Sequence, residues 1–254
     1  MRLCPIRELP KEMSQLYKLR YLHAIHIYSS GFVGVEVPTK VLQSLKELQK
    51  LEMIDIGGEK TRADAAGMIL NELRNLKELR KFGIIFRREN MVEVSSLISE
   101  MQHLESLTVQ SAHEDEIMDL EIGNKKTLCS LRCVYIHRGK MHKLPEWVSQ
   151  LVNLVSLGLW DSRLKEDPLP ILGRLPNLAQ LVLCECYEGE QLDVGTSGFP
   201  KLQRLEIRGM KELKSIIGSA PPLFQQGLIV GCPKLEEVPP EMKHLVPKFR
   251  SSIK

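Results

Sequence analysis

Histidine and cysteine are the residues of this chain whose chemistry could serve catalysis or metal binding. Seven histidines occur, but none stands in the His-Glu-x-x-His spacing that places zinc ligands on one helix face. No serine stands in the Gly-x-Ser-x-Gly turn that exposes the nucleophile of many hydrolases. The sequence therefore predicts no catalytic site, and we expect that the chain is not an enzyme.

The cysteines are scattered along the chain, at Cys4, Cys129, Cys133, Cys184, Cys186 and Cys232. Only Cys184 and Cys186 stand close together, and no second Cys or His pair has the spacing that would complete a zinc site. Cys186 and Cys232 fall at turn positions that favour a small buried side chain. We therefore expect reduced structural thiols, and neither a metal nor a cofactor.

The charge balance argues against a polyanionic partner. Lys and Arg number 35 against 32 Asp and Glu, a net charge of +3, whereas nucleic-acid binding favours a larger basic excess. No stretch approaches the roughly 18 uncharged apolar residues that a membrane helix needs, and the first residues contain no apolar signal segment. We expect no nucleic acid partner, no membrane span, and a location in the cytoplasm or the nucleus.

A repeated aliphatic unit organises the chain. Leucine supplies 39 of the 254 residues, and the unit apolar-x-x-apolar-x-apolar recurs every 22 to 29 residues. Periods of this length are typical of leucine-rich repeats, whose units bury their apolar sides only by stacking on one another. The eight clear copies and a degenerate ninth begin at Leu22, Leu51, Leu79, Leu104, Leu131, Leu154, Leu178, Leu202 and Phe224.

This pattern predicts an α/β leucine-rich-repeat solenoid of about nine repeats, shaped as a horseshoe. Each unit should add one strand to a concave parallel sheet and return by a helical or irregular segment on the convex side. Helical spacing predicts helices within residues 39–48, 62–76 and 91–104, whereas prolines should shorten the later returns. We expect one domain over residues 1–254, with repeats from about 16 to 240 and a C-terminal cap or tail at 241–254.

The later repeats contain characteristic sequence segments, which include LVNLVSLGLW at 151–160, DPLP at 167–170, LPNL at 175–178 and GCPKL at 231–235. They resemble the leucine-rich-repeat domain of plant disease-resistance proteins of the coiled-coil, nucleotide-binding type found in cereals. The opening LPKEMSQLYKLRYL at 9–22 extends the resemblance over essentially the whole chain. The resemblance implies recognition of a pathogen effector or a guarded host protein in innate immune defence, and autoinhibition of a nucleotide switch.

The switch module itself is not part of this resemblance. Its phosphate-binding loop has the form G-x-x-x-x-G-K-[ST], and no such loop occurs in the chain. Residues 1–90 hold 16 Lys and Arg against 11 Asp and Glu, and little sequence precedes the first repeat to cover its apolar end. In the family that the sequence resembles, the early repeats dock on the nucleotide-binding module, so the resemblance implies that this basic early half docks on such a module, in cis or in trans. A solvated basic surface is the alternative.

The strand register predicts the residues of a partner-binding concave face. Repeats five to seven should place aromatic and aliphatic side chains beside one another on an exposed surface, a signal of a partner site. Packing against a loop or the receptor's own body is the alternative. Arg204, Glu206 and Arg208 would add a charged flank, or form a surface ion-pair lattice. The other candidate residues on this face are His26, Tyr28, Tyr135, His137, Trp160, Val182 and Cys184.

Other readings of the same pattern remain open at this point. An acidic run at 113–121 predicts a solvated loop, or a docking site for a basic partner. A rival function is a free-standing scaffold, or a substrate receptor in ubiquitination, that uses the same concave sheet. An F-box-like segment would support it, but few residues precede Leu9. A GTPase-activating arginine finger would have to be Arg87, Arg88 or Arg138.

Overall fold

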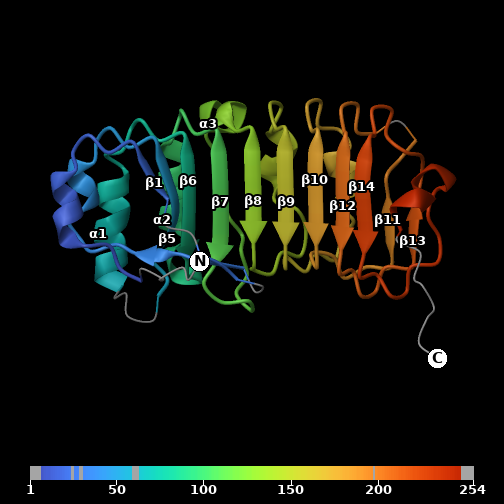
Figure 1. Cartoon of the computed structure of the whole chain (residues 1–254), viewed down its shortest axis with the longest axis horizontal. Helices are drawn as coiled ribbons and strands as arrows, with labels where there is room; N and C mark the ends of the chain where they lie inside the picture. The colour runs from blue at the N-terminus through green and yellow to red at the C-terminus, as the bar shows by residue number, and fades with distance from the viewer. Residues whose placement is uncertain (1–6, 24–25, 29–30, 59–62, 197, 247–254) are drawn as a thin grey trace, which may run out of the picture.

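The structure is a computed structural model that describes residues 7–23, 26–28, 31–58, 63–196 and 198–246. Its main element is a ten-stranded sheet in which successive repeats lie side by side (Figure 1). All strand pairs in this sheet are parallel. Its main strands, in spatial order, are β1 (Tyr21–His23), β5 (Lys50–Asp55), β6 (Lys81–Phe86), β7 (Ser106–Ser111), β8 (Cys133–His137), β9 (Ser156–Trp160), β10 (Gln180–Cys184), β12 (Arg204–Arg208) and β14 (Gln226–Val230).

The apolar anchors of the repeats stack in register, because each strand pairs with the next at equivalent positions. From β7 to β12, the second anchors Leu107, Val134, Leu157, Leu181 and Leu205 are aligned and buried. The third anchors form a parallel buried row, Val109, Ile136, Leu159, Leu183 and Ile207. Together with the parallel order of the strands, these rows confirm the predicted α/β leucine-rich-repeat architecture.

The predicted frame is wrong in the first two repeats. Leu51 pairs with Phe82 and not with Leu79, so it is a second anchor, and Leu48 is the first. Leu22 pairs with Leu51 and is likewise a second anchor. The shift arises at Met53, an extra buried residue with a φ of 58°, where the register between β5 and β6 is irregular.

The first repeat also contains an excursion from the main sheet. After β1 the chain forms an antiparallel pair, β2 (His26–Tyr28) with β3 (Gly31–Val33), and β4 (Val35–Glu36) then returns to pair with β5. His26 and Tyr28 therefore lie on β2, outside the main sheet, and their prediction as concave-face residues is wrong. Their side chains lie outside the described part of the structure. On the sheet, His23 stands beside Glu52 instead.

The returns vary in type along the chain. The predicted helices within 62–76 and 91–104 are confirmed as α1 (Ala63–Leu73) and α2 (Met91–Glu100). The prediction for 39–48 is wrong, since that return holds only the 3-10 turn η2 (Leu42–Ser44). The later returns are short, as expected, and contain α3 (Lys125–Ser130), η4 (Glu146–Gln150), α4 (Leu169–Leu172) and the strands β11 (Gln191–Asp193) and β13 (Ser215–Ile217).

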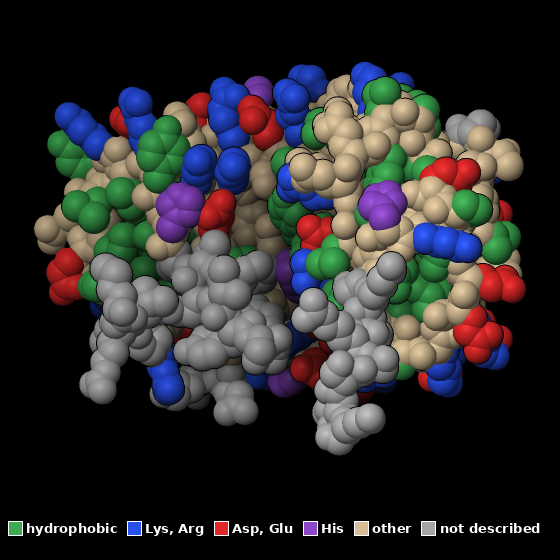
Figure 2. All heavy atoms as spheres, turned by 45° about the vertical axis from the view of Figure 1, so that its right-hand side comes forward, with side chains coloured by type: hydrophobic (Ala, Val, Ile, Leu, Met, Phe, Trp, Pro, Cys, Tyr) green, Lys and Arg blue, Asp and Glu red, His purple; other side chains and the backbone are tan. Residues whose placement is uncertain are grey.

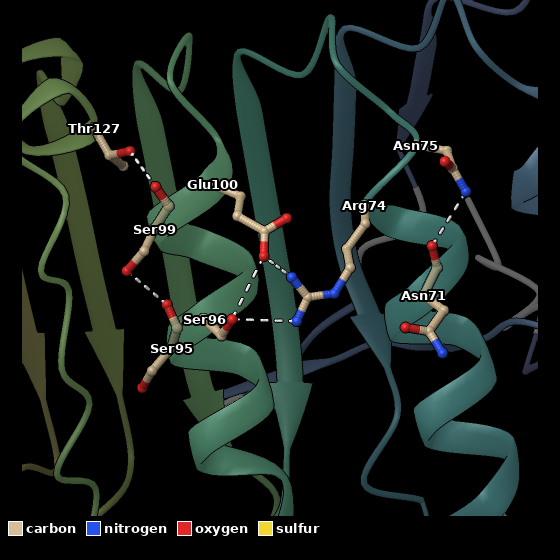
Figure 3. A network of polar contacts seen from close by, with 8 residues as sticks. All are labelled: Asn71, Arg74, Asn75, Ser95, Ser96, Ser99, Glu100 and Thr127. Atoms are coloured by element: carbon tan, nitrogen blue, oxygen red, sulfur yellow. Dashed lines mark hydrogen bonds and ion pairs between the residues drawn. The ribbon is translucent and has the colours of Figure 1, made fainter.

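Polar contacts link neighbouring returns on the side of the helices (Figure 3). Arg74, which directly follows α1, forms an ion pair with Glu100 of α2 and donates a hydrogen bond to the hydroxyl of Ser96 at 3.2 Å. Thr127 of α3 donates to the carbonyl of Ser99 at 2.9 Å. These contacts link the return of one repeat to the return of the next.

The last coil is closed by the 3-10 segment η5 (Pro240–Leu245). Met242 and Leu245 of this segment are buried and belong to the same hydrophobic cluster as the strand anchors. The predicted cap at 241–254 begins in this segment, and residues 247–254 lie outside the described part of the chain. Among the described residues, no helix is long and apolar enough to span a membrane.

Candidate partner-binding site

The side of the sheet turned away from the core, which we call the strand face, carries the candidate residues. One row on this face reads Tyr135, Gly158, Val182 and Glu206 from β8 to β12. The next row reads His137, Trp160, Cys184 and Arg208. The predicted neighbourhood of repeats five to seven is thus confirmed. We refer to Tyr135, His137, Trp160, Val182 and Cys184 as the aromatic patch.

The indole of Trp160 packs against two other rings of the aromatic patch. The imidazole of His137 stacks on the indole of Trp160, with ring centroids 4.2 Å apart and planes 10° from parallel. The ring of Tyr135 lies 6.0 Å from that of Trp160, tilted by 52°. The hydroxyls of Tyr135 and Ser156 are 3.2 Å apart and share a hydrogen bond. The rings are therefore held in place before any partner arrives.

Gly158 gives Trp160 its position. A Cβ atom on Gly158 would lie 2.0 Å from Cζ3 and 2.1 Å from Cη2 of the Trp160 indole. These distances are far below van der Waals contact, so the indole occupies the space that a side chain at 158 would need. The repeat frame alone places Gly158 on this face but assigns it no such role, because a glycine in a strand has several explanations.

The patch is less exposed than the sequence suggested. His137 is only 6% exposed, so its prediction as an exposed surface residue is wrong. Burial, and then the charge of Arg138, lower the pKa of His137 to about 4. The imidazole is therefore neutral at physiological pH. Tyr135, Trp160, Val182 and Cys184 are half-buried, so they still present surface to a partner.

The two neighbouring cysteines have different environments but similar chemistry. Cys184 is half-buried in the patch, and its pKa is raised by burial and then by Glu185 and Asp161. Cys186 is fully buried in the turn that follows, and burial raises its pKa strongly. Both are free thiols in the structure, and their raised pKa keeps both protonated at neutral pH. Among the described residues, no group of three or more His, Cys, Asp or Glu could hold a metal ion.

Charged residues with left-handed backbone follow the strands at the edge of the patch. Arg138, Asp161 and Glu185 have φ values of 53°, 52° and 48°. Their amides donate to the next strand's carbonyls, at Trp160, Cys184 and Arg208 respectively. Gly209 and Gly231 hold the corresponding places in later repeats, also with positive φ. Sequence reasoning missed Asp161 and Glu185, although the later glycines were a signal for this turn.

The charged flank of repeat eight is partly self-paired. Arg208 donates to the carboxylate of Glu206 on the same strand, at 2.8 and 3.1 Å. Arg204 reaches Gln226 on β14 at 3.4 Å. These contacts agree with the ion-pair alternative and leave a specificity role untested.

The acidic run after β7 contacts the protein's own basic residues. Asp115 pairs with Lys140 at 2.7 Å and with Arg163 at 3.7 Å, and Glu114 lies 3.8 Å from Arg138. These charges come from the two following repeats, so the loop is tied along the ends of the strands. The side chains of Glu114 and Asp115 remain 61% and 82% exposed, so the loop is solvated, as one of the two predictions had it, and its charges are paired at the surface.

Comparisons with known proteins agree with this architecture. A family model described as "Leucine-rich repeat region" matches residues 1–245. A solved leucine-rich-repeat protein of Leptospira interrogans, 19% identical, superposes with a TM-score of 0.52 over 92% of this chain and 63% of that one. This structural likeness concerns the fold alone.

The curated relatives agree with the resemblance noted in the sequence. Probable disease resistance protein RF9 of Arabidopsis thaliana is 28% identical, over 97% of this chain and 26% of its own length. Disease resistance protein RPM1 of the same plant is 30% identical, over 90% of this chain and 24% of its own length. The chain thus spans about a quarter of the relatives it matches. With the family model matching nearly all of it, this chain belongs to the leucine-rich repeat region family.

Proposed function

We propose that this chain is a recognition module in plant defence against pathogens, which binds a pathogen effector or a guarded host protein. The observation that carries the proposal is the aromatic patch, whose rings are held in place on the repeat sheet. The relatives of the chain are disease-resistance proteins. Trp and Tyr side chains bury a large area at low entropic cost, and they dominate many protein interfaces. Their mutual stacking reduces that cost further.

The proposal includes restraint of a nucleotide-binding switch by the early repeats, in cis or in trans. The N-terminal end of the sheet supports it, because Leu16, Tyr17 and Tyr21 are 50%, 62% and 53% exposed. Lys18 and Lys50 lie over the rings of Tyr17 and Tyr21, at 5.8 and 5.2 Å from their centroids. An apolar surface with a basic border suits a partner domain with an acidic face.

The proposed role requires neither catalysis nor a cofactor. The chain would act by binding alone in the cytoplasm or the nucleus, without a nucleic acid partner. Contact with the recognised protein would shift the population of the switch between its off and on states, and the shift is limited by the difference in affinity for the two states.

Proximity labelling in pathogen-challenged leaves tests the recognition role. The chain, fused to a biotin ligase, is compared with the double variant Tyr135→Ala, Trp160→Ala. A matched control, Met68→Ala with Val92→Ala, removes exposed apolar side chains from the helices. We expect that the wild type and the control will both label a pathogen or host protein. The patch variant should not label that protein. An identical set of labelled proteins for all three chains would refute recognition by the patch.

A further inference from the structure

Two carboxylates stand at one border of the aromatic patch. Asp161 directly follows Trp160 at the end of β9, and Glu185 directly follows Cys184 at the end of β10. Because β9 and β10 pair in register, the two acidic residues come from adjacent rungs of the sheet. Burial raises the pKa of the Cys184 thiol, and Glu185 and Asp161 raise it further against the opposing effect of Arg208, so both carboxylates act on this residue of the patch.

These carboxylates are incompletely neutralised. Asp161 is half-buried, and its pKa is raised by burial and then by Glu185 and Glu114, against opposing effects of Arg138 and Arg163. The ion pair of Glu185 is with Lys211, at 4.0 Å, and the Lys211 side chain is 79% exposed. An exposed pair of this kind contributes little stabilisation and is easily replaced.

The opposite border of the patch is neutral to basic. The strands begin there with Cys133, Ser156 and Gln180, followed by Arg204 on β12. Arg132 precedes β8 and lines an open groove of about 700 Å³ together with Arg80, Lys201 and Glu105, which pairs with Arg80 at 2.7 Å. Figure 2, in which the strand starts are uppermost, shows Lys and Arg side chains along this edge, with some Asp and Glu among them. The starts of β9 and β10 are therefore uncharged and their ends carry Asp161 and Glu185, while Arg132 and Arg204 flank the first border and Arg138 and Arg208 flank the second.

We propose that the aromatic patch takes an extended segment of a partner protein in which a Lys or Arg side chain neighbours an apolar one. The apolar side chain packs on Trp160 and Val182, and the cation lies at the strand ends beside Asp161 and Glu185. The reverse orientation would take the cation away from both carboxylates and toward Arg132 and Arg204, so the position of Asp161 and Glu185 sets the direction of the segment. This inference rests on the proposed recognition role and specifies the chemistry of the partner.

Three synthetic peptides test this chemistry on the purified chain. The probe is Ac-Gly-Ser-Leu-Lys-Phe-Lys-Leu-Ser-Gly-NH2, and its two counterparts carry Glu or Ser in place of both Lys residues. Calorimetry at low ionic strength gives the affinities, and Trp fluorescence reports on the patch. The variant Asp161→Asn, Glu185→Gln removes both charges with little change in shape. The matched control Glu78→Gln, Glu93→Gln removes two exposed charges away from the strand face, and a thermal melt checks that each variant is folded.

We expect the Lys peptide to bind the wild type and the control about tenfold more tightly than the Glu peptide does, a ratio that two partly exposed ion pairs can supply. The Asp161→Asn, Glu185→Gln variant should no longer show this preference. The Trp160→Ala variant should bind all three peptides more weakly than the wild type does. Equal affinities that still depend on Trp160 would overturn the cation preference and leave recognition by the patch standing. Failure of all three peptides to bind at millimolar concentration would also overturn the inference, whereas the labelling experiment judges the proposed function separately.

Discussion

The imidazole of His137 and the indole of Trp160 lie face to face on adjacent strands, 4.2 Å apart and 10° from parallel. A parallel sheet with matched register brings equivalent positions of neighbouring repeats to about 4.8 Å, which lies within the range of about 4.5–7 Å between the centroids of interacting aromatic rings. The repeat thus turns two residues that are 23 positions apart into one rigid surface element. The predictions below follow from this element and from the contacts that support it.

Substitution of Gly158 by Ala should displace the indole, since the new Cβ would lie 2.0 Å from its Cζ3 atom. We expect a loss of about 1–3 kcal/mol in the free energy of unfolding, typical of overpacking, and a red shift of the Trp fluorescence. Trp147 is buried and contributes equally to both chains. Gly123→Ala is the control, because a Cβ there meets nothing within 4 Å. An unchanged emission spectrum would show that the indole does not rest on Gly158.

The free energy of unfolding should decrease as the pH is lowered, because of His137. Its pKa is lowered to about 4 in the folded chain, against 6.5 ordinarily, so only the unfolded chain binds the proton between these values. Acidification through that window therefore favours unfolding, by at most about 3 kcal/mol in total. Urea unfolding at pH 7 and pH 4.5 should show a smaller loss for His137→Phe than for the wild type. The exposed His142 provides a control: if His142→Gln changed the pH dependence as much, His137 would not be its source.

Glu72 should be important for the early repeats. This buried carboxylate of α1 accepts hydrogen bonds from the amides of Leu42 and Gln43, at 2.9 and 3.2 Å, and from that of Lys40. Glu72→Ala should lower the free energy of unfolding by about 2–4 kcal/mol, because buried amides lose charge-assisted partners. Glu72→Gln should lower the free energy of unfolding less, since the amide oxygen of the glutamine still accepts hydrogen bonds. Chemical unfolding measures both, and equal stabilities of all three chains would contradict this role.

Cys186 should resist alkylation in the folded chain. Its side chain is fully buried and its pKa is raised, so both access and thiolate formation are suppressed at pH 8. Iodoacetamide followed by mass spectrometry of peptides should find Cys186 modified only after unfolding. Rapid modification of Cys186 under native conditions would show that the turn after β10 opens readily.

The sequence predicts the later repeats better than the early ones, for a physical reason. Near β5, leucines recur every three residues, at Leu42, Leu45, Leu48 and Leu51, so two frames fit the pattern equally well. The residue that decides between them is Met53, whose left-handed φ accommodates an extra position in the strand. A methionine gives no signal of such a conformation, since methionine rarely adopts it.

The candidate site shows a similar division. The repeat frame predicts that Tyr135, His137 and Trp160 are neighbours, because register alone determines which residues share a row. Stacking and burial of His137 depend on side-chain rotamers and on Gly158, which the period does not specify. The acidic border at Asp161 and Glu185 depends on a turn that these residue types only occasionally adopt. The sequence thus locates the patch, and the structure supplies its shape and its charge.

The most direct test of recognition by the aromatic patch is the affinity of the purified chain for a protein identified by labelling, measured for the wild type and for Trp160→Ala. A Trp at the centre of an interface commonly contributes at least about 2 kcal/mol, which corresponds to roughly 30-fold in Kd. We expect a weakening of that size, with a melting temperature that shows the variant to be folded. A Kd within about twofold of the wild type would contradict the account.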